Sequence, residues 1–267
     1  MDNYYYCAEK ATPTGSPEYY MTLYLPLSVK RRWIAWRALQ HELFNIARRV
    51  SESAVALQKL GWWQGEIMHL CEGKPLHPIT KLLHESLPNG LEYKQFESLL
   101  IRLEEDITHF EFPTEHNFQL EALTRYRLSI ESTFDLPEVS LIHLCSSMHF
   151  FDVLQHLQTD QSLGLCMLPV DKIASIGLQY DQLLEENNRV KFSHFLEEYN
   201  RMLRTDALSN IQGISASAMF YWKCLHKVAA SQINCNLTKQ PSNQRQKKDL
   251  FYLSPLYLLW LAFSSRF

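Results

Sequence analysis

The sequence predicts an all-α protein, and three observations support this prediction. Apolar residues recur at steps of three and four along most of the 267 residues, which is the period of an amphipathic helix. No segment shows the sustained alternation of apolar and polar residues that is typical of a half-buried strand. The chain also has only 8 glycines, which argues against a β-rich fold and against a glycine-rich nucleotide-binding loop.

Predicted helices account for most of the chain. The first is expected to begin with Ser28 as its cap and to bend near 51–53. The predicted ranges are 28–60, 61–71, 80–87, 92–110, 114–134, 137–163, 179–186, 189–207 and 214–231. No shift of composition divides the chain, so we expect a single domain over 1–267, with a flexible loop at 236–249 before an apolar C-terminal helix.

Composition excludes several classes of function. The formal net charge is −3 and no long basic block occurs, so we expect no nucleic-acid partner. The 6 cysteines form no CxxC pair, which predicts reduced core residues rather than disulfides or a zinc site. The first ten residues contain neither an apolar signal core nor an arginine-rich presequence, so a cytoplasmic location is expected.

The C-terminal stretch Phe251–Phe263 is the most membrane-like part of the sequence. It is shorter than the roughly 20 apolar residues of a spanning helix, and it contains Pro255. A polar, basic segment, 239–248, precedes it. The pair suits peripheral contact with an anionic membrane on its inner face. The alternative is a last helix that packs into the core, and the short length favours that alternative.

Short fragments spread over the chain, in a fixed order, carry a resemblance to a known family. They are Tyr6-Cys7, Lys10, Gly15-Ser16, Tyr19-Tyr20, Leu25-Pro26, Lys30-Arg31-Arg32, Ala35, Ala38, Glu42, Ile46, Trp62-Trp63, Glu66, His77-Pro78, Asp106, Tyr126, Gly164, Leu168-Pro169 and Asp171. Together they resemble the squalene/phytoene synthase family. The closest likeness is to its degenerate phytoene-synthase-like group, which includes the mitochondrial complex I assembly factor.

This resemblance implies the isoprenoid (prenyl) synthase fold, in which helices surround a central cavity. Two aspartate-rich motifs then face each other and bind Mg²⁺ ions that hold prenyl diphosphates. Ionisation of an allylic diphosphate develops negative charge on the leaving group, and metal ions held by carboxylate oxygens neutralise that charge. Aspartates four residues apart lie on one face of a helix, so each motif can coordinate from one side.

The first metal motif of the family falls on Phe44, Asn45 and Arg48 in this sequence. None of them is a carboxylate, and Arg48 brings a permanent positive charge to the place of a cation. Glu42 could reach inward, but one carboxylate is a poor replacement for a pair. The sequence therefore predicts that this helix does not hold magnesium.

The second motif is half lost, since its positions carry Asp152, Gln155, His156 and Asp160. Asp152, His156 and Asp160 follow one another at steps of four and share a helical stripe, which would suit a repurposed site for an ion that accepts imidazole. The more economical interpretation is a polar cavity wall in which Asp160 or Asp152 pairs with Arg48.

Two basic or aromatic positions beyond the second motif are also changed. The arginine and tyrosine of the family's GRxYLP segment are Leu165 and Met167 here. Four further residues match family positions and are candidates for the cavity or for a ligand: Tyr20, Glu42, Asp106 and Tyr126.

Two classes of function follow from the resemblance, beside a third possibility of a scaffold whose cavity is filled with side chains, Phe44 among them, and whose surface carries the function. The first is a non-catalytic protein that binds an isoprenoid lipid or helps to assemble a membrane respiratory enzyme, with a subunit of that enzyme as partner. The second is an active prenyltransferase that joins two prenyl diphosphates head to head, with Asp106, Asp152 and Asp160 as its remaining carboxylates. We expect no cofactor in the first case and Mg²⁺ only in the second.

Overall fold

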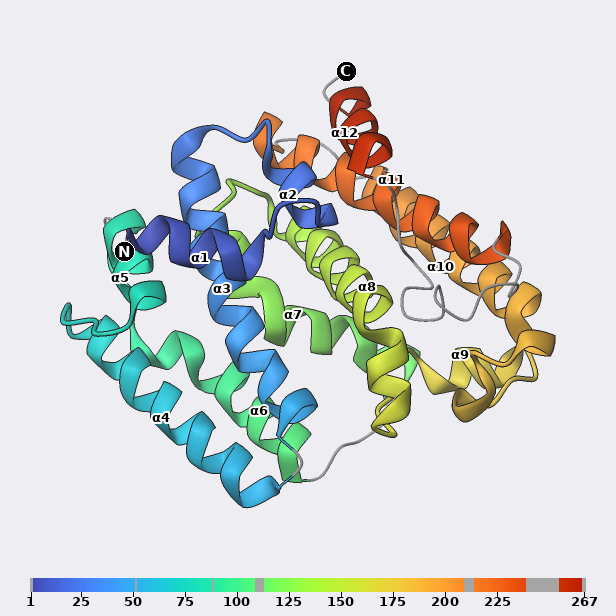
Figure 1. Cartoon of the computed structure of the whole chain (residues 1–267), viewed down its shortest axis with the longest axis horizontal. Helices are drawn as coiled ribbons and strands as arrows, with labels where there is room; N and C mark the ends of the chain where they lie inside the picture. Colours follow the sequence, from blue (N-terminus) through green and yellow to red (C-terminus); the bar gives the residue numbers. More distant parts are fainter. Residues whose placement is uncertain are drawn as a thin grey trace. The chain divides into compact units, whose positions relative to one another are not determined.

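The computed structural model describes residues 2–50, 52–87, 89–108, 113–208, 214–238 and 255–265 (Figure 1). Within these residues the secondary structure consists of α-helices and short 3-10 turns, without a strand. The all-α prediction is confirmed. The chain separates into two compact units, which we describe one at a time: unit 1 is Met1–Glu111 with Leu128–Asp135, and unit 2 is Phe112–Arg127 with Leu136–Phe267. The expectation of one domain stays a prediction.

Unit 1 is built around a long helix, α3, which packs against α1, α4, α5 and α6. Two tryptophans of α3, Trp33 and Trp36, are almost fully buried because the helix is covered on several sides. The elements of this unit are α1 (Asn3–Ala11), α2 (Pro17–Thr22), α3 (Leu27–Arg49), α4 (Ser53–Cys71), α5 (Pro78–Ser86), the 3-10 turn Tyr93–Phe96 and α6 (Glu97–Thr108).

Unit 2 contains α8, α10 and α11, each packed against the other two, and α12 packs on α11 (Figure 1). Aromatic and aliphatic side chains from these helices and from α7 form its core, among them Phe118, Phe150 and Phe192. The elements are α7 (Glu115–Glu131, whose last turn belongs to unit 1), α8 (Glu138–Ser162), α9 (Val170–Ser175), the 3-10 turns Tyr180–Gln182 and Glu186–Asn188, α10 (Arg189–Leu208), α11 (Ala216–Thr238) and α12 (Pro255–Ser264).

The prediction of one helix over 28–60 is wrong. Val50 takes an extended backbone conformation (φ −113°, ψ 109°) and ends α3, and α4 starts anew at Ser53. The helix expected separately at 61–71 is the continuation of α4. Pro26, not Ser28, is the N-cap of α3, with a non-helical backbone (φ −53°, ψ 144°) and no side-chain capping bond.

Other boundaries also differ from the expectation. The helix predicted at 179–186 is replaced by two 3-10 turns, which the side chain of Asn188 joins by donating to the Gln182 carbonyl (3.0 Å). Residues 236–238 of the expected loop are the last residues of α11, and 239–249 lie outside the described residues. The helices α1, α2 and α9 were not predicted, whereas the C-terminal apolar helix is confirmed as α12.

Most of the cysteines whose side chains are described lie in the core, as predicted. Five free cysteines occur there, and Cys7, Cys145, Cys166 and Cys224 are buried. Among the helices described, none is long and apolar enough to cross a membrane.

Candidate functional site

The first motif lies in the last two turns of α3. Phe44 and Asn45 are buried, and Arg48 is half-buried. The nearby carboxylate of Glu42 forms an ion pair with Lys10 of α1. Burial raises the pKa of Glu42, but the hydrogen bond and charge of Lys10 outweigh it, so the pKa is lowered. Glu42 is therefore an ionised group that a cation of the protein already neutralises.

Two other candidates in unit 1 are also engaged by neighbours. Asp106 is buried in α6 and pairs with Arg102 one turn earlier, with 3.2 Å between Nη2 and Oδ1. Tyr20 is half-buried in α2, where its ring meets the ring of Tyr19 edge to face at 5.2 Å. Both residues contribute to packing or charge pairing inside unit 1.

The second motif lies on α8, in unit 2. Asp152 is buried and accepts a hydrogen bond from the hydroxyl of Tyr126, the family-matched tyrosine of α7. His156 bonds through Nδ1 to the backbone carbonyl of Asp152 (2.8 Å). Since a carbonyl only accepts, Nδ1 carries the proton of this bond. Gln155, which is exposed, donates from Nε2 to Oε1 of Gln232 on α11 (2.8 Å).

Asp160 is buried near the end of α8, and its backbone carbonyl closes the helix by accepting from Leu163 (3.1 Å) and Leu165 (2.8 Å). Gly164 follows with φ +73°, the left-handed conformation that favours glycine at a helix end. No three His, Cys, Asp or Glu side chains of the described part of the chain form a group that could hold a metal ion. The stripe of Asp152, His156 and Asp160 therefore does not form such a group. The predicted pairing of Arg48 with Asp152 or Asp160 joins the two units and stays a prediction.

Three residues that carry the resemblance in unit 1, Trp63, Glu66 and His77, meet at the turn between α4 and α5. Glu66 is buried and accepts hydrogen bonds from the backbone N–H of Leu76 (2.8 Å), the N–H of His77 (2.7 Å) and the hydroxyl of Thr80. The ring of His77 lies 5.0 Å from that of Trp63. Glu66 therefore fixes the turn rather than presenting a free carboxylate.

The matched residues after the second motif also have structural contacts. The Asp171 carboxylate accepts the backbone N–H of Glu115 (2.9 Å), one of the first N–H groups of α7. The backbone N–H of Val170, which follows Pro169, donates to the carbonyl of Pro113 (3.0 Å). These contacts attach the segment after α8 to the start of α7.

A buried polar chain in unit 2 was not predicted from the sequence. The Ser147 hydroxyl lies 3.0 Å from Nε2 of His226, and Nδ1 of His226 lies 2.8 Å from Oδ1 of Asn200. Burial, with a smaller contribution from the charge of Arg204, lowers the pKa of His226 to about 3. The order hydroxyl, imidazole, amide resembles a nucleophile with its base, but all three side chains are buried. These three hydrogen-bonded side chains therefore form a structural link between α8, α10 and α11.

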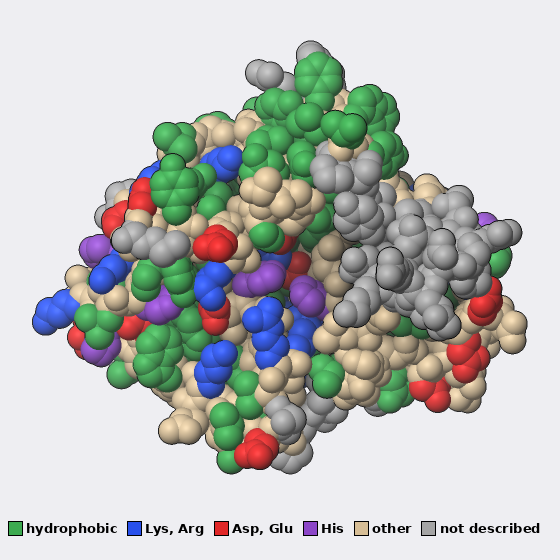
Figure 2. All heavy atoms as spheres, viewed as in Figure 1, with side chains coloured by type: hydrophobic (Ala, Val, Ile, Leu, Met, Phe, Trp, Pro, Cys, Tyr) green, Lys and Arg blue, Asp and Glu red, His purple; other side chains and the backbone are tan. Residues whose placement is uncertain are grey.

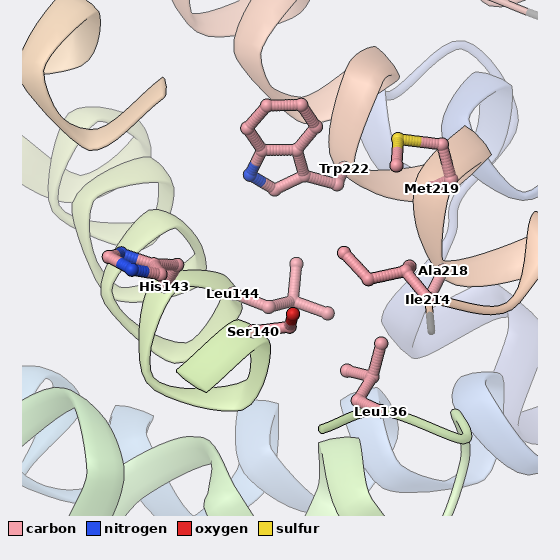
Figure 3. A pocket seen from close by; sticks show the side chains of 8 residues that line it. All are labelled: Leu136, Ser140, His143, Leu144, Ile214, Ala218, Met219 and Trp222. Atoms are coloured by element: carbon pink, nitrogen blue, oxygen red, sulfur yellow. The ribbon is translucent and has the colours of Figure 1, made fainter. Parts of the chain in front are cut away.

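A pocket lies at the start of α8 and α11, entirely within unit 2 (Figure 3). It contains about 310 Å³ of empty space, part of it open to solvent, and apolar side chains dominate its wall. The lining residues are Leu136, Ser140, His143, Leu144, Ile214, Ala218, Met219 and Trp222. No sequence motif pointed to it, because its wall is assembled from two helices and the segments before them.

The residues at the motif positions do not fit a pair of magnesium sites. Phe44 offers no ligand atom, Asn45 offers one neutral oxygen, and Arg48 is a cation. Oδ2 of Asp152 accepts the hydroxyl of the buried Tyr126, and His156 supplies a softer nitrogen where a carboxylate would be needed. The donor set therefore differs in kind from the carboxylate cage that Mg²⁺ prefers.

Comparison with solved structures identifies the fold. A dehydrosqualene synthase in complex with a ligand is similar to the chain with a TM-score of 0.74 and 15% identity, over 98% of this chain and 95% of that one. Squalene synthase HpnC from Alicyclobacillus acidocaldarius is similar with a TM-score of 0.54 and 12% identity, over 99% of this chain and 93% of that one. No family model and no curated sequence matches the chain. The chain has the all-α isoprenoid synthase fold that these squalene-type synthases share.

Proposed function

We propose that this chain is a non-catalytic protein of the squalene/phytoene synthase type that binds an isoprenoid lipid. The observation that supports the proposal best is the state of the carboxylates that could replace a lost metal motif. Glu42 pairs with Lys10, Asp106 pairs with Arg102, and Asp152 accepts the Tyr126 hydroxyl. A Mg²⁺ ion needs carboxylate oxygens directed at it, and here protein groups bind those oxygens.

Chemistry that ionises a diphosphate would be severely weakened by these changes. Removal of one group that stabilises transition-state charge costs about 10²–10³ in rate. The first motif offers no carboxylate, and the second has histidine at its centre. The alternative, head-to-head condensation of two prenyl diphosphates, would depend on Asp106, Asp152 and Asp160.

Lipid binding is tested by extracting the purified protein with organic solvent and identifying the extract by mass spectrometry. We expect an isoprenoid at a molar ratio near that of the protein. A parallel titration with farnesol should show saturable binding to the lipid-free protein. An extract without isoprenoid, together with no binding of farnesol, would contradict the proposal.

We further propose that α12 attaches the protein to an anionic membrane surface. The helix has no charged residue, and one of its sides packs on α11 through Leu258, Leu261 and Ala262. The opposite side is also apolar, and hydrophobic atoms gather there in Figure 2. Its exposed residues are Leu256 (81%), Tyr257 (41%), Leu259 (41%), Trp260 (57%) and Phe263 (50%).

Physical arguments favour a bilayer surface as the partner of this side. Ten residues span about 15 Å at the helical rise, too little to cross a membrane but enough to lie in its interface. Tryptophan and tyrosine favour the membrane–water boundary. Lys223 and Lys227 on α11, with Arg204 on α10, supply positive charge near the end of α12, where Lys227 donates to the Ser264 carbonyl (2.8 Å).

Vesicle sedimentation tests the membrane proposal. The double variant Trp260→Ser, Phe263→Ser should bind vesicles of phosphatidylglycerol and phosphatidylcholine at least about 10-fold more weakly than the parent, because two large apolar side chains are removed from the interface. A matched control, Leu120→Ser with Val190→Ser, changes two exposed apolar residues elsewhere in unit 2. Equal binding by the parent and the α12 variant would contradict the proposal.

The sequence resemblance supports one more element of the proposed function, a role in assembling or maintaining a membrane respiratory enzyme. Affinity purification from membranes in mild detergent should then recover a subunit of such an enzyme. Recovery of the protein without any respiratory subunit would count against this role and leave the lipid-binding proposal in place.

A further inference from the structure

We infer that Arg204, Lys223 and Lys227 form a binding site for the phosphate monoester headgroup of an anionic phospholipid, beside the exposed apolar side of α12. The inference rests on the proposed attachment of α12 to a membrane. It adds the chemistry of the headgroup and the residues that recognise it.

The packing of α10 against α11 brings these cations together (Figure 1). Lys223 and Lys227 are one turn apart on α11 and therefore share one face of that helix. Arg204 lies one turn after Asn200 of α10, whose Oδ1 atom is 2.8 Å from Nδ1 of His226 on α11. The charge of Arg204 accordingly acts on both His226 and Lys227. The three cations thus form one cluster within unit 2.

The cluster lacks a counter-charge among the side chains that the structure describes. Neither α11 nor α12 contains Asp or Glu, and Glu198 of α10 pairs with Arg201 instead (3.5 Å between Oε1 and Nη2). Burial, together with the charges of Lys223 and Arg204, lowers the pKa of Lys227, which is the direction expected when cations repel one another. A bound anion would relieve this repulsion.

Lys227 is held at the C-terminal end of α12. Its ammonium group donates to the backbone carbonyl (2.8 Å) and to the hydroxyl oxygen (3.1 Å) of Ser264. An ammonium group has three N–H donors, so one of them remains for a ligand. Ser264 directly follows Phe263, which is 50% exposed on the apolar side of α12. A phosphate bound by Lys227 would therefore lie next to a surface that suits the acyl chains of a lipid.

The number of cations favours a phosphate monoester over a diester. A monoester carries about −1.5 to −2 charges at neutral pH, and its second negative charge is the one that a diester lacks. Arginine and lysine form strong, charge-assisted hydrogen bonds with phosphate oxygens. Among anionic phospholipids, phosphatidic acid has a monoester headgroup, whereas phosphatidylglycerol has a diester. The cluster should therefore prefer phosphatidic acid.

Vesicles that differ in their anionic lipid test the inference. Sedimentation would compare phosphatidylcholine vesicles that contain phosphatidic acid with vesicles that contain phosphatidylglycerol, at equal measured surface potential. We expect the parent to bind the phosphatidic acid vesicles about 5-fold more tightly, the effect of one charge-assisted hydrogen bond at its weaker end. Arg204→Gln with Lys223→Gln should abolish this preference. Lys172→Gln with Lys191→Gln removes two exposed lysines elsewhere in unit 2 and should preserve it.

The outcomes separate the inference from the proposed function. Equal binding of both kinds of vesicle by the parent, with binding lost in Trp260→Ser, Phe263→Ser, would overturn the inference and leave the attachment through α12 intact. Binding to neither kind would overturn both. A preference that is also lost in Lys172→Gln, Lys191→Gln would assign it to net charge and overturn the inference.

A soluble phosphate monoester provides the last arm of the test. Glycerol 3-phosphate has the headgroup chemistry of phosphatidic acid but no acyl chains, so at a concentration equal to that of the lipid it should leave vesicle binding unchanged. Complete competition by glycerol 3-phosphate would assign the cluster to a soluble phosphate and overturn the lipid as its ligand.

Discussion

The turn after α4 and the middle of α8 each bury a carboxylate, and the two carboxylates differ in the groups that donate hydrogen bonds to them. Glu66 is one of the residues that carry the resemblance. It accepts hydrogen bonds from two backbone N–H groups of the turn and from the hydroxyl of Thr80. Asp152 occupies a metal-motif position, and a tyrosine hydroxyl holds it. Glu66 therefore fixes the backbone of a turn, whereas Asp152 joins two helices through a bond between side chains.

This difference separates carboxylates that fix the backbone from carboxylates that pair with another side chain. Glu66 in unit 1 and Asp171 in unit 2 both accept backbone N–H groups and fix connections between helices. Such bonds are needed for any function of the fold. Glu42 and Asp152 instead have side-chain partners, Lys10 and the Tyr126 hydroxyl, which stabilise the buried or half-buried carboxylates.

The largest effect is expected at the turn after α4. Glu66→Ala removes three hydrogen bonds to a charged acceptor and leaves buried donors unsatisfied, so the free energy of unfolding should fall by about 3 kcal/mol. Urea unfolding measures this change. Glu72→Ala, an exposed residue at the end of the same helix, is the control and should change stability by less than about 0.5 kcal/mol. A loss below 1 kcal/mol for Glu66→Ala would show that Glu66 does not fix the turn between α4 and α5.

A smaller loss of stability is expected when the bond between Tyr126 of α7 and Asp152 of α8 is removed. Tyr126→Phe removes the hydroxyl that donates to the buried Asp152 carboxylate, so the free energy of unfolding should fall by about 2 kcal/mol. Tyr5→Phe changes an exposed tyrosine and should be neutral. If Tyr126→Phe were neutral as well, Asp152 would not depend on this bond, and its assignment to the packing would be wrong.

The buried His226 makes stability depend on pH in a defined direction. Burial lowers its pKa from about 6.5 to about 3, so the unfolded ring gains a proton below pH 6.5 while the folded ring does not. Stability is complete above this pH and should fall by about 1.4 kcal/mol per pH unit below it. His77, whose pKa burial also lowers, contributes in the same direction. Urea unfolding between about pH 7 and pH 5 measures the slope.

A variant of His226 identifies the source of that slope. His226→Gln should be less stable at neutral pH, and its stability should change less steeply with pH, whereas His69→Gln, at an exposed position, should keep the slope of the parent. An unaltered slope in His226→Gln would assign the pH dependence to other groups.

The smallest effect is expected at an exposed motif position. Gln155→Arg places a charged side chain at an exposed position, and it costs only the bond to Gln232. The free energy of unfolding should therefore fall by about 0.5 kcal/mol. A loss above 2 kcal/mol would show that this position also has a structural role.

The fold could be predicted from the sequence because helical periodicity and the family-matched residues report on it directly. The break between α3 and α4 was placed at the right residues but taken for a bend, since no proline or glycine marks Val50. The chain of Ser147, Asn200 and His226 and the pocket beside it could not be predicted, because they depend on which helices of unit 2 lie together. Small polar residues on otherwise apolar faces of α8, α10 and α11 were the one available signal.

The assignment of Phe44, Asn45, Arg48 and His156 to metal-motif positions rests on the resemblance and stays a prediction. The sequence could not reveal the partners of the candidate carboxylates. The pairings of Glu42 with Lys10 and of Asp152 with Tyr126 cross from one helix to another, and neither has a spacing that could be read along the chain.

The most direct test of the central claim is diphosphate release. The protein would be incubated with farnesyl or geranylgeranyl diphosphate and with Mg²⁺ or Mn²⁺, and free diphosphate would be measured against a protein-free control. We predict no release above that control, because the motif positions lack the carboxylates that bind these ions. Metal-dependent turnover that disappears in Asp160→Ala would contradict this account.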